Sequence, residues 1–93
     1  MEICKMMIMS TGHISKNTAI LLDKDRVGVV VYPKDNYGWF IVVTDWKDDE
    51  TASIPEDLKQ CLSLAEKNGC DWLCLDCDGE CYPELPIYDW SKL

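Results

Sequence analysis

The alternation of apolar and polar side chains predicts four strands. Residues 3–9 and 37–43 are almost continuously apolar, which is typical of strands covered on both faces at the centre of a sheet. Residues 27–32 are rich in β-branched side chains and predict a strand that forms a hairpin with residues 37–43 across a turn at residues 33–36. Residues 71–76 place Trp72 and Cys74 on one face and Leu73 and Leu75 on the other. This alternation predicts a half-exposed edge strand.

Two helices separate these strands. Ser15 is the expected N-cap of a helix that runs to about Lys24. The spacing of Ser53 and Glu56 is that of a capping box, and it predicts a second helix with Pro55 in its first turn. The pair at residues 68–69, Asn-Gly, predicts the end of that helix.

The order β-α-β-β-α-β predicts an α+β fold, the ferredoxin-like sandwich, over a single domain of residues 1–93. In that fold the sheet is antiparallel, its first and third strands are central, and two helices cover one face. The turn at Asp78 and Gly79 allows a short return strand at residues 80–82, and the apolar, aromatic residues 83–90 predict a packed C-terminal tail. The second face of the sheet is left either covered or available for binding. Pairing of the edge strand at residues 27–32 with a second copy leaves a homodimer open.

The sequence also indicates the cellular compartment of the protein. No apolar run approaches the roughly 20 residues that span a bilayer, and the first residues lack the pattern of a signal peptide. We therefore expect a cytoplasmic protein without a membrane partner, whose cysteines are reduced thiols. We expect no cofactor.

Charge divides the chain into two halves. Residues 1–44 hold four acidic and five basic side chains, whereas residues 45–93 hold thirteen acidic and four basic ones, within a net charge of −8. Such an acidic half disfavours direct binding of nucleic acid and favours a basic protein surface, for example that of a nucleic-acid-handling protein. The expected partner-binding residues are the acidic groups and two tryptophan anchors: Asp45, Trp46, Asp48, Asp49, Glu50, Asp76, Asp78, Glu80 and Trp90.

Two other constellations suggest chemistry. Ser10, Thr11 and His13 lie where the first strand meets the first helix, and they are the candidates for a small-ligand or catalytic site. The alternative, which we favour, is that they cap and support the start of the helix. A cluster of four cysteines offers thiolates for a structural zinc ion, although only one pair has C-x-x-C spacing: Cys70, Cys74, Cys77 and Cys81. Buried, small apolar side chains are the favoured interpretation of that cluster.

Six short segments, taken together in order, resemble an uncharacterised bacterial family, a domain of unknown function carried largely on plasmids, phages and integrated elements. They are Ser10-Thr11-Gly12-His13-Ile14, Tyr37-Gly38-Trp39-Phe40, Ile54-Pro55-Glu56-Asp57-Leu58, Gly69-Cys70-Asp71-Trp72-Leu73, Asp78-Gly79-Glu80 and Leu85-Pro86-Ile87-Tyr88-Asp89-Trp90. The chain departs from the family where alanine, a basic residue and an aliphatic residue are usual, at Gly12, Cys77 and Cys81. Those departures weaken the zinc interpretation.

The resemblance implies a genomic setting and no catalytic residues. Small acidic proteins of mobile elements often act by occupying host proteins, sometimes by imitating the charge of DNA. We therefore expect a non-enzymatic module that binds a protein. The more specific hypothesis is that it inhibits a defence protein of the host. The alternatives are a ligand or enzymatic site around Ser10, Thr11 and His13, and a domain stabilised by metal.

Overall fold

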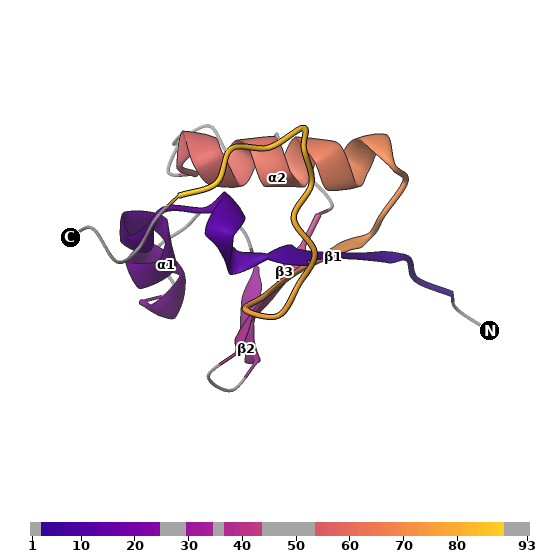
Figure 1. Cartoon of the computed structure of the whole chain (residues 1–93). Helices are drawn as coiled ribbons and strands as arrows, with labels where there is room; N and C mark the ends of the chain where they lie inside the picture. The colour runs from indigo at the N-terminus through magenta and orange to yellow at the C-terminus, as the bar shows by residue number, and fades with distance from the viewer. Residues whose placement is uncertain (1–2, 25–29, 35–36, 44–53, 89–93) are drawn as a thin grey trace.

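The regular elements follow the predicted order of strands and helices (Figure 1). The structure, a computed structural model, describes residues 3–24, 30–34, 37–43 and 54–88. Within them lie β1 (Met6–Ser10), a short 3-10 helix η1 (Thr11–His13), α1 (Lys16–Asp23), β2 (Val31–Lys34), β3 (Gly38–Val42), α2 (Glu56–Lys67) and β4 (Trp72–Asp76). The chain is therefore a small α+β structure with a four-stranded sheet and two helices in its described part.

The sheet has the order β1-β4-β3-β2, which differs from the ferredoxin-like order. β4 pairs with β1 in parallel and with β3 antiparallel, so the sheet is mixed. The prediction that β1 is central and β4 lies at an edge is therefore wrong, whereas β3 is central and β2 is an edge strand, as predicted.

Side-chain burial explains why β4 is a central strand and β1 an edge strand, the reverse of the prediction. In β4, Leu73 and Leu75 are fully buried on one face, and Cys74, on the other face, is only 1% exposed. A strand that buries both faces belongs at the centre of a sheet. In β1, Met9 is buried but Met6 and Ile8 are 42% and 50% exposed, so its continuous apolar run does not reflect burial on both faces.

Both helices end close to the predicted positions. Ser15 is the N-cap of α1, and its side chain accepts a hydrogen bond from the backbone N–H of Thr18. The N-cap of α2 is Pro55 itself, without a side-chain cap, so the prediction that Pro55 lies inside the first turn is wrong. Ser53 lies outside the described residues. Gly69 follows α2 with a φ of +72°, as its role in ending the helix requires. No helix in the described part is long and apolar enough to cross a membrane.

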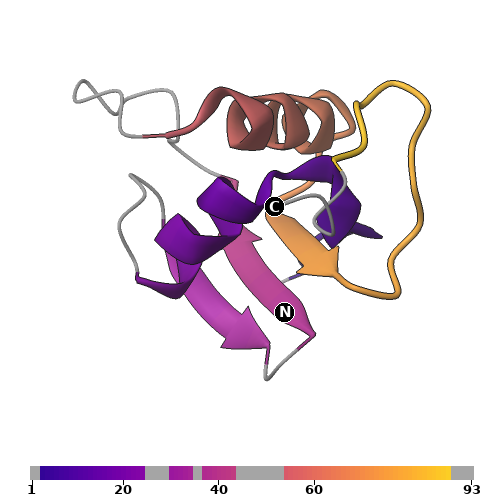
Figure 2. The ribbon, with the colours of Figure 1, turned by 60° about the vertical axis from the view of Figure 1, so that its left-hand side comes forward.

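One hydrophobic core lies between the helices and one face of the sheet. Ile14, Ala19 and Leu22 come from the α1 region, and α2 contributes Leu58, Leu62 and other residues. Alternate residues of the strands meet them: Met9, Trp39, Ile41, Leu73 and Leu75. Trp39 also donates from its indole Nε1 to Asp23 of α1 at 3.0 Å. The two helices therefore cover the same face, as predicted (Figures 1 and 2).

The opposite face of the sheet, which we call the open face, is not covered by either helix. Its apolar members follow from the strand register and the alternation of side chains: Met6, Ile8, Tyr32, Phe40, Val42 and Trp72. Tyr32 is 52% exposed, and its ring lies 6.0 Å from that of Trp72. The described residues thus leave an apolar sheet face in contact with solvent.

Residues 77–88, which we call the strap, run from the end of β4 past β1 to the helices (Figures 1 and 2). The expected turn forms, since Gly79 donates from its backbone N–H to the carbonyl of Asp76 at 2.9 Å. The return strand at residues 80–82 does not form. Instead, Ser10 of β1 donates to the carbonyl of Glu80 at 2.9 Å, and Leu85 is buried in the core. Of the tail that the sequence predicts to pack, residues 83–90, the described part packs only in part: Leu85 is buried and the Tyr88 N–H bonds to the carbonyl of Gly12, whereas Ile87 is 65% exposed.

Candidate functional site

His13 is fixed by the strap on both sides of its ring. The residue is 1% exposed. Its Nε2 accepts a hydrogen bond from the backbone N–H of Tyr82 at 2.9 Å, and its Nδ1 lies 2.9 Å from the carbonyl oxygen of Pro86. A carbonyl oxygen only accepts and an amide N–H only donates, so the geometry requires a neutral ring that carries its proton on Nδ1. In this arrangement neither ring nitrogen is available to a substrate.

Ser10 and Thr11 also have local structural partners. The Ser10 side chain caps η1 by accepting from the N–H of Gly12 at 3.0 Å. The carbonyl of Thr11 accepts from the N–H of Ile14 at 3.2 Å. The structure thus brings the three predicted residues together, and their bonds favour the capping interpretation over a catalytic one.

The arrangement of His13 predicts an observable tautomer. Because His13 is the single histidine of the chain, a long-range ¹H–¹⁵N correlation spectrum contains one imidazole. We expect the neutral ring to carry its proton on Nδ1 and not on Nε2, the reverse of the tautomer that predominates in free histidine. A ring protonated on Nε2 alone, or one exchanging freely between both forms, would contradict the contacts with Tyr82 and Pro86.

Asp57 forms a buried polar connection that the sequence analysis missed. This residue of α2 is 8% exposed. Its carboxylate accepts from the backbone N–H of Ser15 at 2.7 Å and from the hydroxyl of Thr18 at 2.7 Å. It therefore ties the start of α2 to the start of α1. An aspartate in the first turn of a helix usually faces solvent near the positive end of the helix dipole, so the sequence offers no signal for this pairing.

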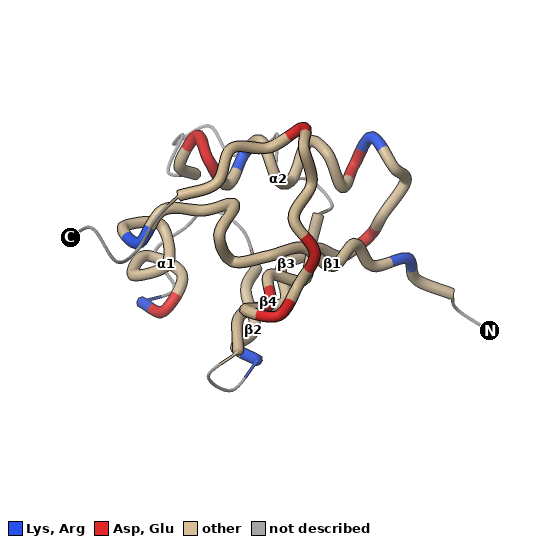
Figure 3. Tube along the Cα trace, in the orientation of Figure 1, with Lys and Arg blue, Asp and Glu red and all other residues tan. Residues whose placement is uncertain are grey.

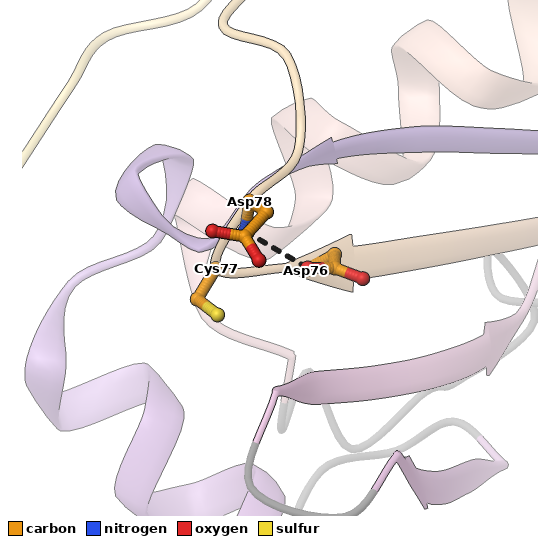
Figure 4. A group of neighbouring side chains, drawn as sticks. All are labelled: Asp76, Cys77 and Asp78. Atoms are coloured by element: carbon orange, nitrogen blue, oxygen red, sulfur yellow. Dashed lines mark hydrogen bonds between the residues drawn. The ribbon is translucent and has the colours of Figure 1, made fainter.

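The four candidate cysteines do not converge on one point. Among the described residues, the group whose potential ligand atoms lie within 4.8 Å of one another is Asp76, Cys77 and Asp78. These are consecutive residues of the turn after β4 (Figure 4). Cys74 is buried in β4, while Cys77 and Cys81 are exposed. The arrangement does not reproduce the tetrahedral set of four thiolates that a structural zinc site uses.

The thiols nearest the core are poor nucleophiles. Burial raises the pKa of Cys74, against the opposing effect of the Lys34 charge. Burial, followed by the charge of Asp57, raises the pKa of Cys61 to about 12. Cys74 and Cys77 also have the C-x-x-C spacing of redox-active thiol pairs. Such a pair needs a lowered thiol pKa, which is the opposite of what the environment of Cys74 provides.

Asp76 is engaged within the sheet. Lys34 of β2 donates a hydrogen bond to its carboxylate and forms a salt bridge with it. That bond, followed by one from the backbone N–H of Asp78, lowers the pKa of Asp76, and the same contact raises the pKa of Lys34. Of the three acidic residues predicted around this turn, Asp76 is thus partly neutralised, whereas Asp78 and Glu80 are exposed.

The other predicted partner-binding residues lie outside the described residues. They are the acidic loop and the two tryptophan anchors: Asp45, Trp46, Asp48, Asp49, Glu50 and Trp90. Their proposed role stays a prediction.

A hollow lies on the open face, the second sheet face that the sequence analysis left either covered or available for binding. It has a volume of about 380 Å³ and is lined by Met6, Tyr32, Phe40 and Trp72. Its four lining residues come one from each strand, so the hollow depends on the order and register of the whole sheet, which the sequence does not reveal.

Comparison with known proteins places the chain in a family. No curated protein and no solved structure matches it. A family model described as "Family of unknown function (DUF5983) C-terminal domain" matches residues 6–90. That range includes β1, both helices, the whole sheet and the strap. The chain therefore belongs to this family of unknown function.

Proposed function

We propose that the protein is a non-enzymatic module that binds a basic surface of a protein partner through its acidic half. The observation that carries the proposal is the uneven charge, with thirteen of the seventeen acidic residues in residues 45–93. Opposite charge speeds the encounter of two proteins and selects among partners.

The strap holds part of the acidic charge of residues 45–93 in a fixed position on the surface. It contains three acidic residues and no basic one, and Asp78, Glu80 and Glu84 are all exposed. Figure 3 shows acidic positions along its course from the turn after β4 toward α2. Bonds to Ser10, to His13 and to Gly12, whose carbonyl accepts from the N–H of Tyr88 at 2.7 Å, hold the strap in place. A preorganised acidic segment loses little conformational freedom on binding.

The finer form of the proposal is an inhibitor, carried by a mobile element and acting in the cytoplasm, of a nucleic-acid-handling protein. An acidic surface can occupy a groove whose positive field normally attracts DNA. The acidic loop and the tryptophans Trp46 and Trp90 complete the proposed surface.

The test begins with affinity capture from a bacterial lysate at low and high salt, read by mass spectrometry. The captured basic protein is then purified, and its association rate with the module is measured across salt concentrations. We expect the double variant Asp78→Asn, Glu80→Gln to associate about threefold to tenfold more slowly at low salt and to show a shallower salt dependence. The triple variant Asp48→Asn, Asp49→Asn, Glu50→Gln is expected to behave likewise.

A matched control shows whether the association rate depends on charge at the acidic surface or only on the net charge of the protein. The double variant Asn17→Lys, Ile20→Lys changes the net charge by the same two units on the exposed side of α1. It should retain most of the association rate. If neither acidic variant alters the rate or its salt dependence while each stays folded, the acidic half is not the binding surface and the proposal fails.

A further inference from the structure

The open face is an exposed apolar surface that the proposed function does not use. Met6, Ile8 and Tyr32 are between 42% and 52% exposed on it, beside the half-buried Phe40 and Trp72. A contiguous exposed apolar patch on a small protein commonly marks a surface that another chain covers. The question is which chain fits here.

Charge on this face points to a second copy of the same protein. Among the described residues, strand register places Lys34 and Asp76 as the charged groups of the face, and they neutralise one another in a salt bridge. A basic partner would be drawn to the acidic strap rather than to this neutral surface. Two chains of net charge −8 repel each other, and they repel least where they meet through a surface that carries no net charge.

The face is also self-complementary. An interface with twofold symmetry brings one surface against itself, so each feature must tolerate its own copy. The apolar residues meet that condition, and a cation and an anion side by side can each face the opposite charge of the second copy. The Lys34 side chain is 34% exposed, so it remains accessible for such an exchange.

Association by the sheet edges is less favourable. The outer edge of β1 is partly occupied by the strap, because Glu80 accepts from Ser10 and the Tyr82 hydroxyl donates to the carbonyl of Ile8 at 3.1 Å. At the other edge, Val30 pairs with Val42 through a hydrogen bond of 3.0 Å, so alternation of the ladder turns the backbone of Pro33 outward. Proline offers no N–H to an added strand, which protects that edge.

The size of the face sets the strength of the contact. Four strands at about 4.8 Å spacing and five residues at about 3.4 Å give a surface on the order of 300 Å² in projection. Stable interfaces bury about 800 Å² on each partner, and weak ones bury less. We propose that the protein forms a weak, reversible homodimer in which the open faces of two copies pack together.

Sedimentation velocity of the whole chain, in reducing buffer, tests the proposal. We expect a monomer–dimer equilibrium that becomes apparent at high micromolar concentration. Added salt should strengthen it, because salt screens the repulsion between the two acidic chains. Binding of a basic partner through the acidic half weakens with salt instead, so the failure of one proposal is distinguishable from the failure of the other.

Two lysine variants locate the contact. Ile8→Lys, on the open face, should weaken dimerisation at least tenfold, although it makes the net charge less negative and so reduces overall repulsion. Ile20→Lys makes the same change of charge on α1 at a position of similar exposure, 42% against 50%, and should leave the dimer intact or slightly strengthen it. Tyr32→Lys provides a second variant on the open face if Ile8→Lys does not fold.

Two results would contradict the proposed homodimer. A monomer at all concentrations up to about 1 mM, at low and high salt, would overturn the proposal. Equal weakening by Ile8→Lys and Ile20→Lys would show that the copies associate elsewhere.

Discussion

Replacement of Asp57 with alanine is expected to lower the free energy of unfolding by about 2–4 kcal/mol. The loss has two parts. The carboxylate gives up its bonds to the backbone N–H of Ser15 and to the hydroxyl of the buried Thr18. The Ser15 N–H is then left without this acceptor, and the Thr18 hydroxyl keeps only the Ser15 hydroxyl, 3.1 Å away, as a neighbouring polar group. For a chain of 93 residues the whole stability is on the order of 5–14 kcal/mol, so this change removes a large part of it. Urea unfolding followed by circular dichroism measures the effect.

The neighbouring acid provides the control. Glu56 lies one residue away in the same turn of α2 but is exposed, so Glu56→Ala should cost less than about 1 kcal/mol. A double-mutant cycle with Thr18→Val isolates the bond between the two helices. The Asp57→Ala penalty should be smaller in that background, because the hydroxyl that needs an acceptor is gone. Equal effects of Asp57→Ala and Glu56→Ala would show that the buried connection does not stabilise the fold.

Local sequence signals predicted the order of the helices and strands, but not the places of β1 and β4 in the sheet. The second strand was also misplaced, because residues 33 and 34 of the predicted turn belong to β2 (Val31–Lys34). Ser15 and Gly69 act through bonds to residues a few positions away, and both were interpreted correctly. The order of the strands depends on contacts between distant residues. The apolar run of β1 predicts burial on both faces, whereas Met6 and Ile8 lie on the exposed face.

The same limit applies to the site residues. The sequence placed Ser10, Thr11 and His13 together, because they are neighbours. It gave no reason to place His13 against Tyr82 and Pro86, which lie about seventy residues later and which meet it through backbone atoms that every residue has. Contacts of this kind leave no pattern of side-chain types in the sequence. The acidic turn after β4 was identified, but the neutralisation of Asp76 by Lys34 required the sheet register.

Gly38→Ala is the second change with a large expected effect, a loss of about 3 kcal/mol or more, with failure to fold as its extreme. Gly38 begins β3 with a φ of +154°, a conformation that residues with a side chain rarely adopt. A Cβ atom there would lie 1.6 Å from the carbonyl oxygen of Leu75 in the neighbouring β4. Relief of that contact requires separation of the two central strands, so the damage is not confined to a flexible side chain. Thermal unfolding followed by circular dichroism provides the measurement.

Gly12→Ala is the matched control, because it adds the same methyl group where the backbone is compatible. A Cβ at Gly12 would lie 3.2 Å from the Ser10 hydroxyl oxygen and 3.6 Å from a side-chain carbon of Ile87. The exposed Ile87 side chain can shift, and the Ser10 hydroxyl has to move by only a few tenths of an ångström, within reach of its bond to the Gly12 N–H. We therefore expect its stability to stay within about 1 kcal/mol of the parent chain. The close approach of β3 to β4 would be contradicted if Gly38→Ala unfolded at the same temperature as Gly12→Ala. A melting temperature lowered only for Gly38→Ala would support the special backbone conformation and the tight contact of this position.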